Sequence, residues 1–257
     1  MNKYLKFYSG VNRRVIILMI FTALISVVDV VNIYGKLNFA DVTYTVLFGI
    51  NNITRVSIPL ISRWSIPYIF IIYYIGKYIE NIVLVESSYV WVLRYKSYST
   101  WFKNICMNIL FNIFIYLSIF FISTCFFSLI LTGNINNLSW EYLNLYNNIP
   151  NENISFIYIG IQFLLSYTSL FILILIQIVM SFKYDNIILG ESFSIFCLVF
   201  FGIIAKFDIY NPFMLTKYSI MNDKLSYNPV ITILINISLI FIIMYFISKA
   251  IYLLRRE

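Results

Sequence analysis

The stretch RYKSYSTWFKNICMNILFNIFIYLSIFFISTCFFSLILT, residues 94–132, joins a basic and aromatic opening to a long apolar run. The apolar window at 104–132 would be roughly 43 Å long as a helix, whereas the hydrocarbon core of a bilayer is about 30 Å thick. The stretch therefore predicts a membrane-spanning helix whose beginning projects out of the membrane.

The rest of the chain has the same apolar character. Of 257 residues, 61% are hydrophobic and 11% are charged, which leaves too few charges to cover the surface of a water-soluble domain. We predict an all-α polytopic membrane protein with six transmembrane helices in a single domain, residues 1–257. The apolar windows lie at about 15–34, 65–85, 104–132, 155–182, 187–206 and 229–252.

One partly apolar segment, 42–62, is interrupted by Gly49, Asn51, Asn52 and Arg55. An arginine in the middle of the membrane costs several kcal/mol, so we expect this segment to form a structured or interfacial loop outside the bilayer. If it crossed the membrane, the orientation of everything after it would be inverted.

The distribution of Lys and Arg predicts the orientation. With the first residues in the cytoplasm, eleven cations fall in the inner segments and six in the outer ones. The positive-inside rule therefore places both termini in the cytoplasm. The net charge of +7 is explained by these flanking cations, and we expect no nucleic-acid partner.

Several kinds of chemistry lack the residues that they need. The chain has no histidine, and its three cysteines lie in apolar windows without metal-ligand spacing, so we expect no metal and assign them to packing. Neither Gly35-Lys36 nor Gly76-Lys77 belongs to a phosphate-binding loop. We therefore expect neither a catalytic residue nor a cofactor in this chain.

The segment 86–103, between the second and third windows, is too polar to cross the membrane and too aromatic for a free linker. Tyr and Trp favour the interface, and Lys and Arg can extend to water, so a short helix along the inner leaflet fits this composition. A solvated juxtamembrane loop is the simpler alternative.

Within this segment, ESSYVWVLRYKSYSTWFKNI (86–105) resembles the coupling segment of permease subunits from six-span bacterial ATP-binding cassette exporters. That class includes peptide exporters and bacteriocin or lantibiotic immunity transporters. The matching positions are Glu86, Arg94, Ser97, Ser99, Trp101 and Lys103. Two features differ, because Ser87, Ser88 and Tyr89 replace the usual Gly, and Lys96 replaces a common Pro.

The resemblance implies that residues 86–103, with Lys96 among the contacts, dock onto a separate ATPase that binds ATP and Mg²⁺. It also implies a second permease chain, identical or not, and a location in the bacterial cytoplasmic membrane. The substrate would be amphipathic or hydrophobic, and an antimicrobial peptide would suit. On this topology Trp101 and Lys103 are expected where a cytoplasmic partner can touch them.

Polar residues inside the windows are the other candidates, because polar groups in hydrocarbon are costly. Lys77 and Glu80 are three positions apart and can neutralise each other, as a structural pair or in gating. Asn104, Asn108 and Asn112 form a stripe that is expected to hydrogen-bond to another helix or to contact substrate. Glu191 is expected to cap the fifth helix or to face the cytoplasmic vestibule.

Three other functional classes remain as alternatives. The first is a membrane accessory or immunity protein that binds a toxin or a partner without transport. An intramembrane enzyme has few residues to support it, because histidine and paired-carboxylate motifs are missing. A secondary carrier would be expected to show an inverted repeat, which the sequence does not display.

Overall fold

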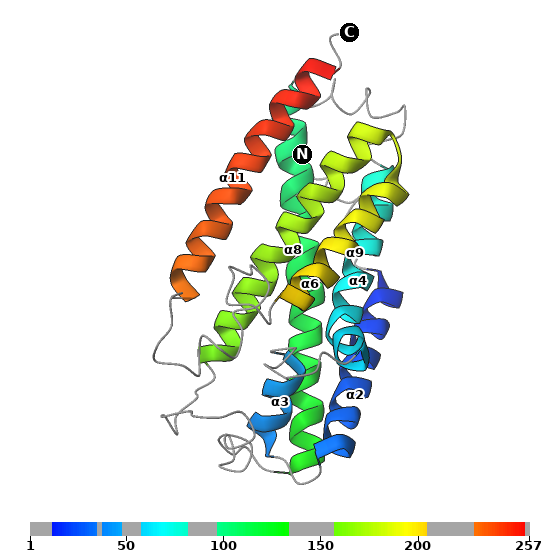
Figure 1. Cartoon of the computed structure of the whole chain (residues 1–257), viewed down its shortest axis with the longest axis vertical. Coiled ribbons are helices and arrows are strands. Elements are labelled where there is room, and N and C mark those ends of the chain that lie inside the picture. The colour runs from blue at the N-terminus through cyan, green and yellow to red at the C-terminus, as the bar shows by residue number, and fades with distance from the viewer. Residues whose placement is uncertain are drawn as a thin grey trace.

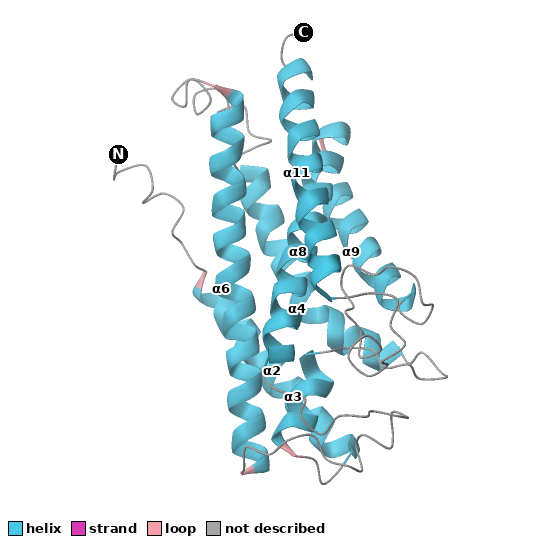
Figure 2. Ribbon diagram, turned by 90° about the vertical axis from the view of Figure 1, so that its left-hand side faces the viewer, coloured by secondary structure: helices cyan, strands magenta, loops and turns pink. Residues whose placement is uncertain are grey.

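A computed structural model describes residues 12–34, 38–47, 58–81, 97–133, 157–204 and 229–254. All regular structure in these ranges is helical, as the sequence predicts (Figure 2). The described helices are α2 (Arg13–Tyr34), α3 (Phe39–Leu47), α4 (Ile58–Ile79), α6 (Tyr98–Thr132), α8 (Ile157–Tyr184), α9 (Ile187–Ile204) and α11 (Pro229–Leu254).

The long helices form an elongated bundle and alternate in direction. α4, α8 and α11 run towards the end of the bundle where α6 and α9 begin, and α2, α6 and α9 run the opposite way (Figure 1). We call this end, where α6 and α9 begin and α4, α8 and α11 finish, the α6-start end. The short helix α3 lies beside α2 and α6 near the opposite end.

α6 is the longest described helix because both of its ends are capped and nothing interrupts its 35 residues. At its start, the Ser97 side chain accepts a hydrogen bond from the Thr100 N–H at 3.2 Å. At its end, Gly133 adopts a φ of 78° and its N–H donates to the Leu129 carbonyl oxygen. The helix begins before the predicted window and reaches about 52 Å at 1.5 Å per residue.

α8 is the central helix of the bundle. In its apolar window 67% is buried, against 39% for α2 and α6. Three polar contacts join it to its neighbours: Tyr68 of α4 lies 3.2 Å from Ser166, Ser194 of α9 donates to the Leu173 carbonyl oxygen, and Asn236 of α11 donates to Thr168. Such contacts between helices supplement van der Waals packing.

The segment 42–62 differs from the predicted loop at both of its ends. Residues 42–47 belong to α3, whose Val42, Val46 and Leu47 are buried, and α4 already begins at Ile58 rather than at residue 65. The side chain of Asp41 accepts a hydrogen bond from the Asn38 N–H, which stabilises the start of α3. Residues 58–64, which include Arg63, belong to α4 although the predicted window starts after them.

Within the described residues, α2, α6 and α8 are long and apolar enough to cross a membrane, and α9 and α11 contain shorter apolar stretches. Large apolar side chains cover the outside of these helices, with Ile17, Ile122 and Phe241 among the most exposed. An apolar outer surface of this extent is expected for a protein surrounded by lipid.

Candidate functional site

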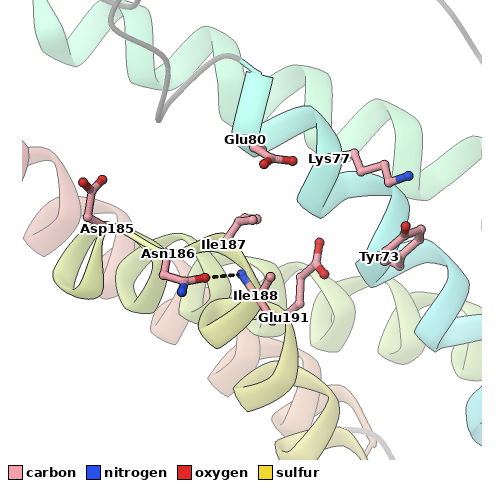
Figure 3. A pocket seen from close by; sticks show the side chains of 8 residues that line it. All are labelled: Tyr73, Lys77, Glu80, Asp185, Asn186, Ile187, Ile188 and Glu191. Carbon is pink, nitrogen blue, oxygen red and sulfur yellow. Dashed lines mark hydrogen bonds between the residues drawn. The ribbon is translucent and has the colours of Figure 1, made fainter.

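A polar cleft of about 670 Å³ opens at the α6-start end, where α4 finishes and α9 begins. Its polar and charged lining comes from the last part of α4, from the α8–α9 connection and from the beginning of α9 (Figure 3). The residues concerned are Tyr73, Lys77, Glu80, Asp185, Asn186 and Glu191.

The connection between α8 and α9 is a tight turn that holds two of these residues at the cleft. Asp185 has a φ of 50°, a left-handed conformation that Asp and Asn tolerate better than most residues. Asn186 donates its N–H to the Ser181 carbonyl oxygen at 3.1 Å, and its side chain accepts from the Ile188 N–H at 2.9 Å. Asn186, rather than Glu191, therefore caps α9.

Two buried glycines allow α4, α8 and α9 to approach closely beside the cleft. A Cβ atom at Gly76 of α4 would overlap the Glu191 carboxylate and lie 2.6 Å from the Gln177 side-chain nitrogen. A Cβ atom at Gly190 of α9 would overlap the Ser181 hydroxyl and lie 2.6 Å from the Gln177 carbonyl oxygen. The missing side chains leave room for the Glu191 carboxylate against the backbone of α4.

The ion pair that we anticipated between Lys77 and Glu80 is not formed, although both side chains line the cleft. The Lys77 ammonium lies 4.7 Å from the centre of the Tyr73 ring, one turn earlier on α4. Figure 3 shows it directed away from Glu80. The attraction of the ring for a cation competes with the carboxylate, so the Glu80 carboxylate remains available in the cleft.

Behind Glu191 lie buried polar groups without partners in the described chain. Neither polar atom of the Gln177 amide makes a hydrogen bond, although the side chain is 0% exposed. The Ser181 hydroxyl, one helical turn later on α8, is also buried and makes no hydrogen bond within the described chain. Most buried polar groups in proteins are hydrogen-bonded, so these exceptions call for an explanation.

The predicted coupling residues fall into two groups. Glu86, Arg94 and Lys96 lie outside the described residues. Ser97, Ser99 and Lys103 are exposed around the first turns of α6, where Ser97 is the N-cap. These turns belong to the same end of the bundle as the cleft (Figures 1 and 2).

The sequence predicted that Trp101 would be accessible to a partner at the surface. This prediction is wrong, because the Trp101 side chain is only 1% exposed. It belongs to the main apolar core together with Phe102 and Ile105. The large apolar area of an indole ring favours packing against neighbouring helices over exposure at the helix start.

The asparagine stripe on α6 also differs from its prediction. Asn104 donates to the Thr100 carbonyl oxygen at 3.1 Å, and Asn112 donates to the Asn108 carbonyl oxygen at 2.9 Å. These hydrogen bonds lie within α6 rather than between helices, because the carbonyl one turn earlier is within reach of a short amide side chain. Only Asn112 of the three is buried.

The sequence indicated Lys77 and Glu80 as a pair and Glu191 by itself, but it did not bring the three residues together. The sequence pattern that could have indicated this site is a small residue directly before a charged one, as in Gly76-Lys77 and Gly190-Glu191. Gln177, a polar residue within the window at 155–182, was not among the predicted site residues. Comparison of the chain with known protein families, curated proteins and solved structures gave no match.

Proposed function

We propose that this chain is the membrane-spanning permease subunit of an ATP-driven exporter. It crosses the bacterial cytoplasmic membrane six times, and a separate ATPase subunit hydrolyses ATP. The pair of permease chains moves an amphipathic or hydrophobic substrate, for which an antimicrobial peptide is a suitable candidate.

The arrangement of the helices supports six crossings. α4 has 22 residues, α9 has 18 and α11 has 26, and all three are apolar like α2, α6 and α8. Because consecutive long helices alternate in direction, each can enter the membrane from the side where the previous one left it. The shortest, α9, is close to the roughly 20 residues that a crossing needs.

The charges favour a cytoplasmic α6-start end. Lys77, Lys103 and Lys183 are exposed towards this end, whereas Asp29 is exposed in the part of α2 near the opposite end. Because Lys and Arg accumulate on the cytoplasmic side of membrane proteins, both the beginning of α6 and the end of α11 are assigned to the cytoplasm.

The observation that carries the proposal is the anchoring of α6 directly after the segment that resembles a coupling segment. Trp101 and Phe102, in the first turns of α6, are buried in the core of the bundle. A force applied before Ser97 would therefore act on packed helices rather than on a free helix end. Close packing makes such an element suitable for transmitting movement.

ATP hydrolysis in proteoliposomes tests this proposal. The chain is reconstituted with its cassette ATPase, and we expect it to stimulate hydrolysis when substrate is present. Glu86→Ala and Arg94→Ala should abolish the stimulation without preventing membrane insertion, because they remove contacts with the ATPase. Asp29→Asn, near the other end, is the matched control and should retain full stimulation.

Full stimulation in the Glu86 and Arg94 variants would contradict the coupling role. The cleft lies within a single chain, which favours a second candidate function, a membrane accessory or immunity protein that binds a ligand without transport. Failure of any cassette ATPase to bind the chain or to respond to it would support this second candidate instead.

A further inference from the structure

We propose that the cleft between α4 and α9 binds the primary ammonium group of an organic ligand, with Glu80 and Glu191 as its carboxylate partners. This inference does not depend on the permease assignment, because it concerns a site formed by one chain.

The charge balance of the cleft favours a cation. Glu80, Asp185 and Glu191 contribute three carboxylates, and Lys77 is the single cation in the lining. The other nearby cation, Lys183, lies over the Tyr184 ring and does not line the cleft. The carboxyl ends of α4 and α8 add negative partial charge here, and the amino end of α9 opposes them.

The buried Gln177 amide provides an independent indication of a ligand. Its nitrogen and a Glu191 carboxylate oxygen both approach the point where a Cβ atom of residue 76 would lie, so the amide is close to a carboxylate that lines the cleft. Its oxygen is an acceptor without a donor in the described chain. An ammonium group has three N–H donors and no acceptor, which matches a site rich in acceptors.

The size of the cleft and the spacing of its acids favour an organic ligand over a metal ion. In the described chain, no three His, Cys, Asp or Glu residues are close enough together to hold a metal ion. A volume of about 670 Å³ is within the range of sites for small organic molecules. The Tyr73 ring, which Lys77 now covers, is a further surface for a cation.

Protection of a cysteine introduced in the cleft tests the proposal. Ile188 lines the cleft and is 66% exposed, so Ile188→Cys should react with a maleimide. The protein is held in phosphatidylcholine nanodiscs, and mass spectrometry of the peptide that contains position 188 gives the rate at this site alone. We expect 1,5-diaminopentane to slow the reaction, whereas the uncharged 1,5-pentanediol should not.

Variants of the charged residues give the decisive comparison. Glu191→Gln should raise the half-protecting concentration of diaminopentane by about tenfold or more, as expected for the loss of a charged hydrogen-bond partner. Lys77→Met should lower it, because the competing cation is removed. Asp29→Asn, remote from the cleft, should leave it unchanged. Size-exclusion profiles show whether each variant is folded.

Two further measurements complete the test. The first distinguishes a lipid headgroup from a soluble amine as the source of the ammonium group, and the second controls for effects of the introduced cysteine. Protection in nanodiscs that contain phosphatidylethanolamine, without diaminopentane, would identify a lipid headgroup, and protection by diaminopentane alone would identify a soluble amine. Equilibrium dialysis of radiolabelled diaminopentane uses the chain with Ile188 intact. The proposal would be overturned if dialysis showed no binding and neither diaminopentane nor phosphatidylethanolamine protected the cysteine. Protection in Glu191→Gln equal to that in the chain with Glu191 intact would also overturn it.

Discussion

Gly76 and Gly190 determine how closely three helices meet beside the cleft. The space at Gly76 is bounded by flexible side chains, those of Glu191 and Gln177. The space at Gly190 is bounded partly by backbone, because the Gln177 carbonyl oxygen and the Ser181 nitrogen lie close to it. A methyl group at residue 190 therefore has less opportunity to be accommodated than one at residue 76.

We expect Gly190→Ala to lower the free energy of unfolding by about 1–3 kcal/mol, the usual range for overpacking a helix interface. The matched control is Gly160→Ala on α8, where a Cβ atom would meet nothing within 4 Å. There the higher helix propensity of Ala should leave stability unchanged or raise it by up to about 1 kcal/mol. Thermal unfolding in detergent measures both, and equal effects would contradict this packing.

At the scale of elements, α8 connects the other helices, and polar side chains mark where they attach. One of these is Asn236, a fully buried residue of α11 whose side chain lies 3.2 Å from Thr168 and 3.4 Å from Ser169 of α8. Much of the remaining surface of α11 is exposed and apolar. These hydrogen bonds therefore select the face that α11 turns towards α8.

Asn236→Ala should destabilise the attachment of α11 by about 0.6–1.7 kcal/mol, the range measured for hydrogen bonds between membrane helices. Ser238→Ala is the matched control, because the Ser238 hydroxyl is exposed and donates to the Leu234 carbonyl oxygen of its own helix. Unfolding in increasing denaturing detergent gives the comparison. A larger effect at residue 238 than at 236 would show that α11 packs in another register.

For the whole molecule, the decisive property is which end faces the cytoplasm. The capped start of α6, the polar cleft and the finish of α8 share one end of the bundle, and Leu131 lies near the opposite end. If the first end is cytoplasmic, the proposed coupling segment and the proposed amine-binding cleft are both on the side where an ATPase partner would bind. If this end is external, none of the proposed coupling residues between 86 and 103 can contact an ATPase in the cytoplasm.

Ser97→Cys should therefore resist a membrane-impermeant maleimide in intact cells and react in inside-out vesicles, since the native Ser97 is exposed and cytoplasmic in this orientation. Leu131→Cys, which is exposed at the far end of α6, should show the reverse preference. Site-specific mass spectrometry separates both from Cys106, Cys125 and Cys197. Reaction of residue 97 only from outside would exclude the proposed coupling role.

Much of the helical architecture could be predicted from the sequence, because a long apolar run is a local property of the chain. The window at 187–206 corresponds to α9 at Ile187–Ile204, and the window at 155–182 corresponds to α8 at Ile157–Tyr184. The window at 65–85 starts later than α4, which begins at Ile58, because residues 58–64 include Arg63 and are less uniformly apolar than the rest of the helix. The number of crossings stays a prediction.

Of the candidate site, the sequence predicted the Lys77–Glu80 pair and Glu191, but not the cleft that they line together. Periodicity placed Lys77 and Glu80 on one helical face, but it could not show that the Tyr73 ring draws Lys77 away from Glu80. The asparagine spacing suggested contacts between helices, whereas the nearest acceptors are in α6 itself. Trp101 looked like an interfacial residue and is buried, because the packing of its neighbours is invisible in a local pattern.

The sequence by itself determined the helical, membrane-type character of this protein, because the cost of exposing apolar runs to water depends on composition and length alone. Only the tertiary structure decided that Gly76, Gln177 and Glu191 meet beside one cleft. These residues belong to three different helices, and their distances depend on how closely the helices pack. That closeness arises from the shapes of side chains that face one another in space, which no local stretch of sequence records.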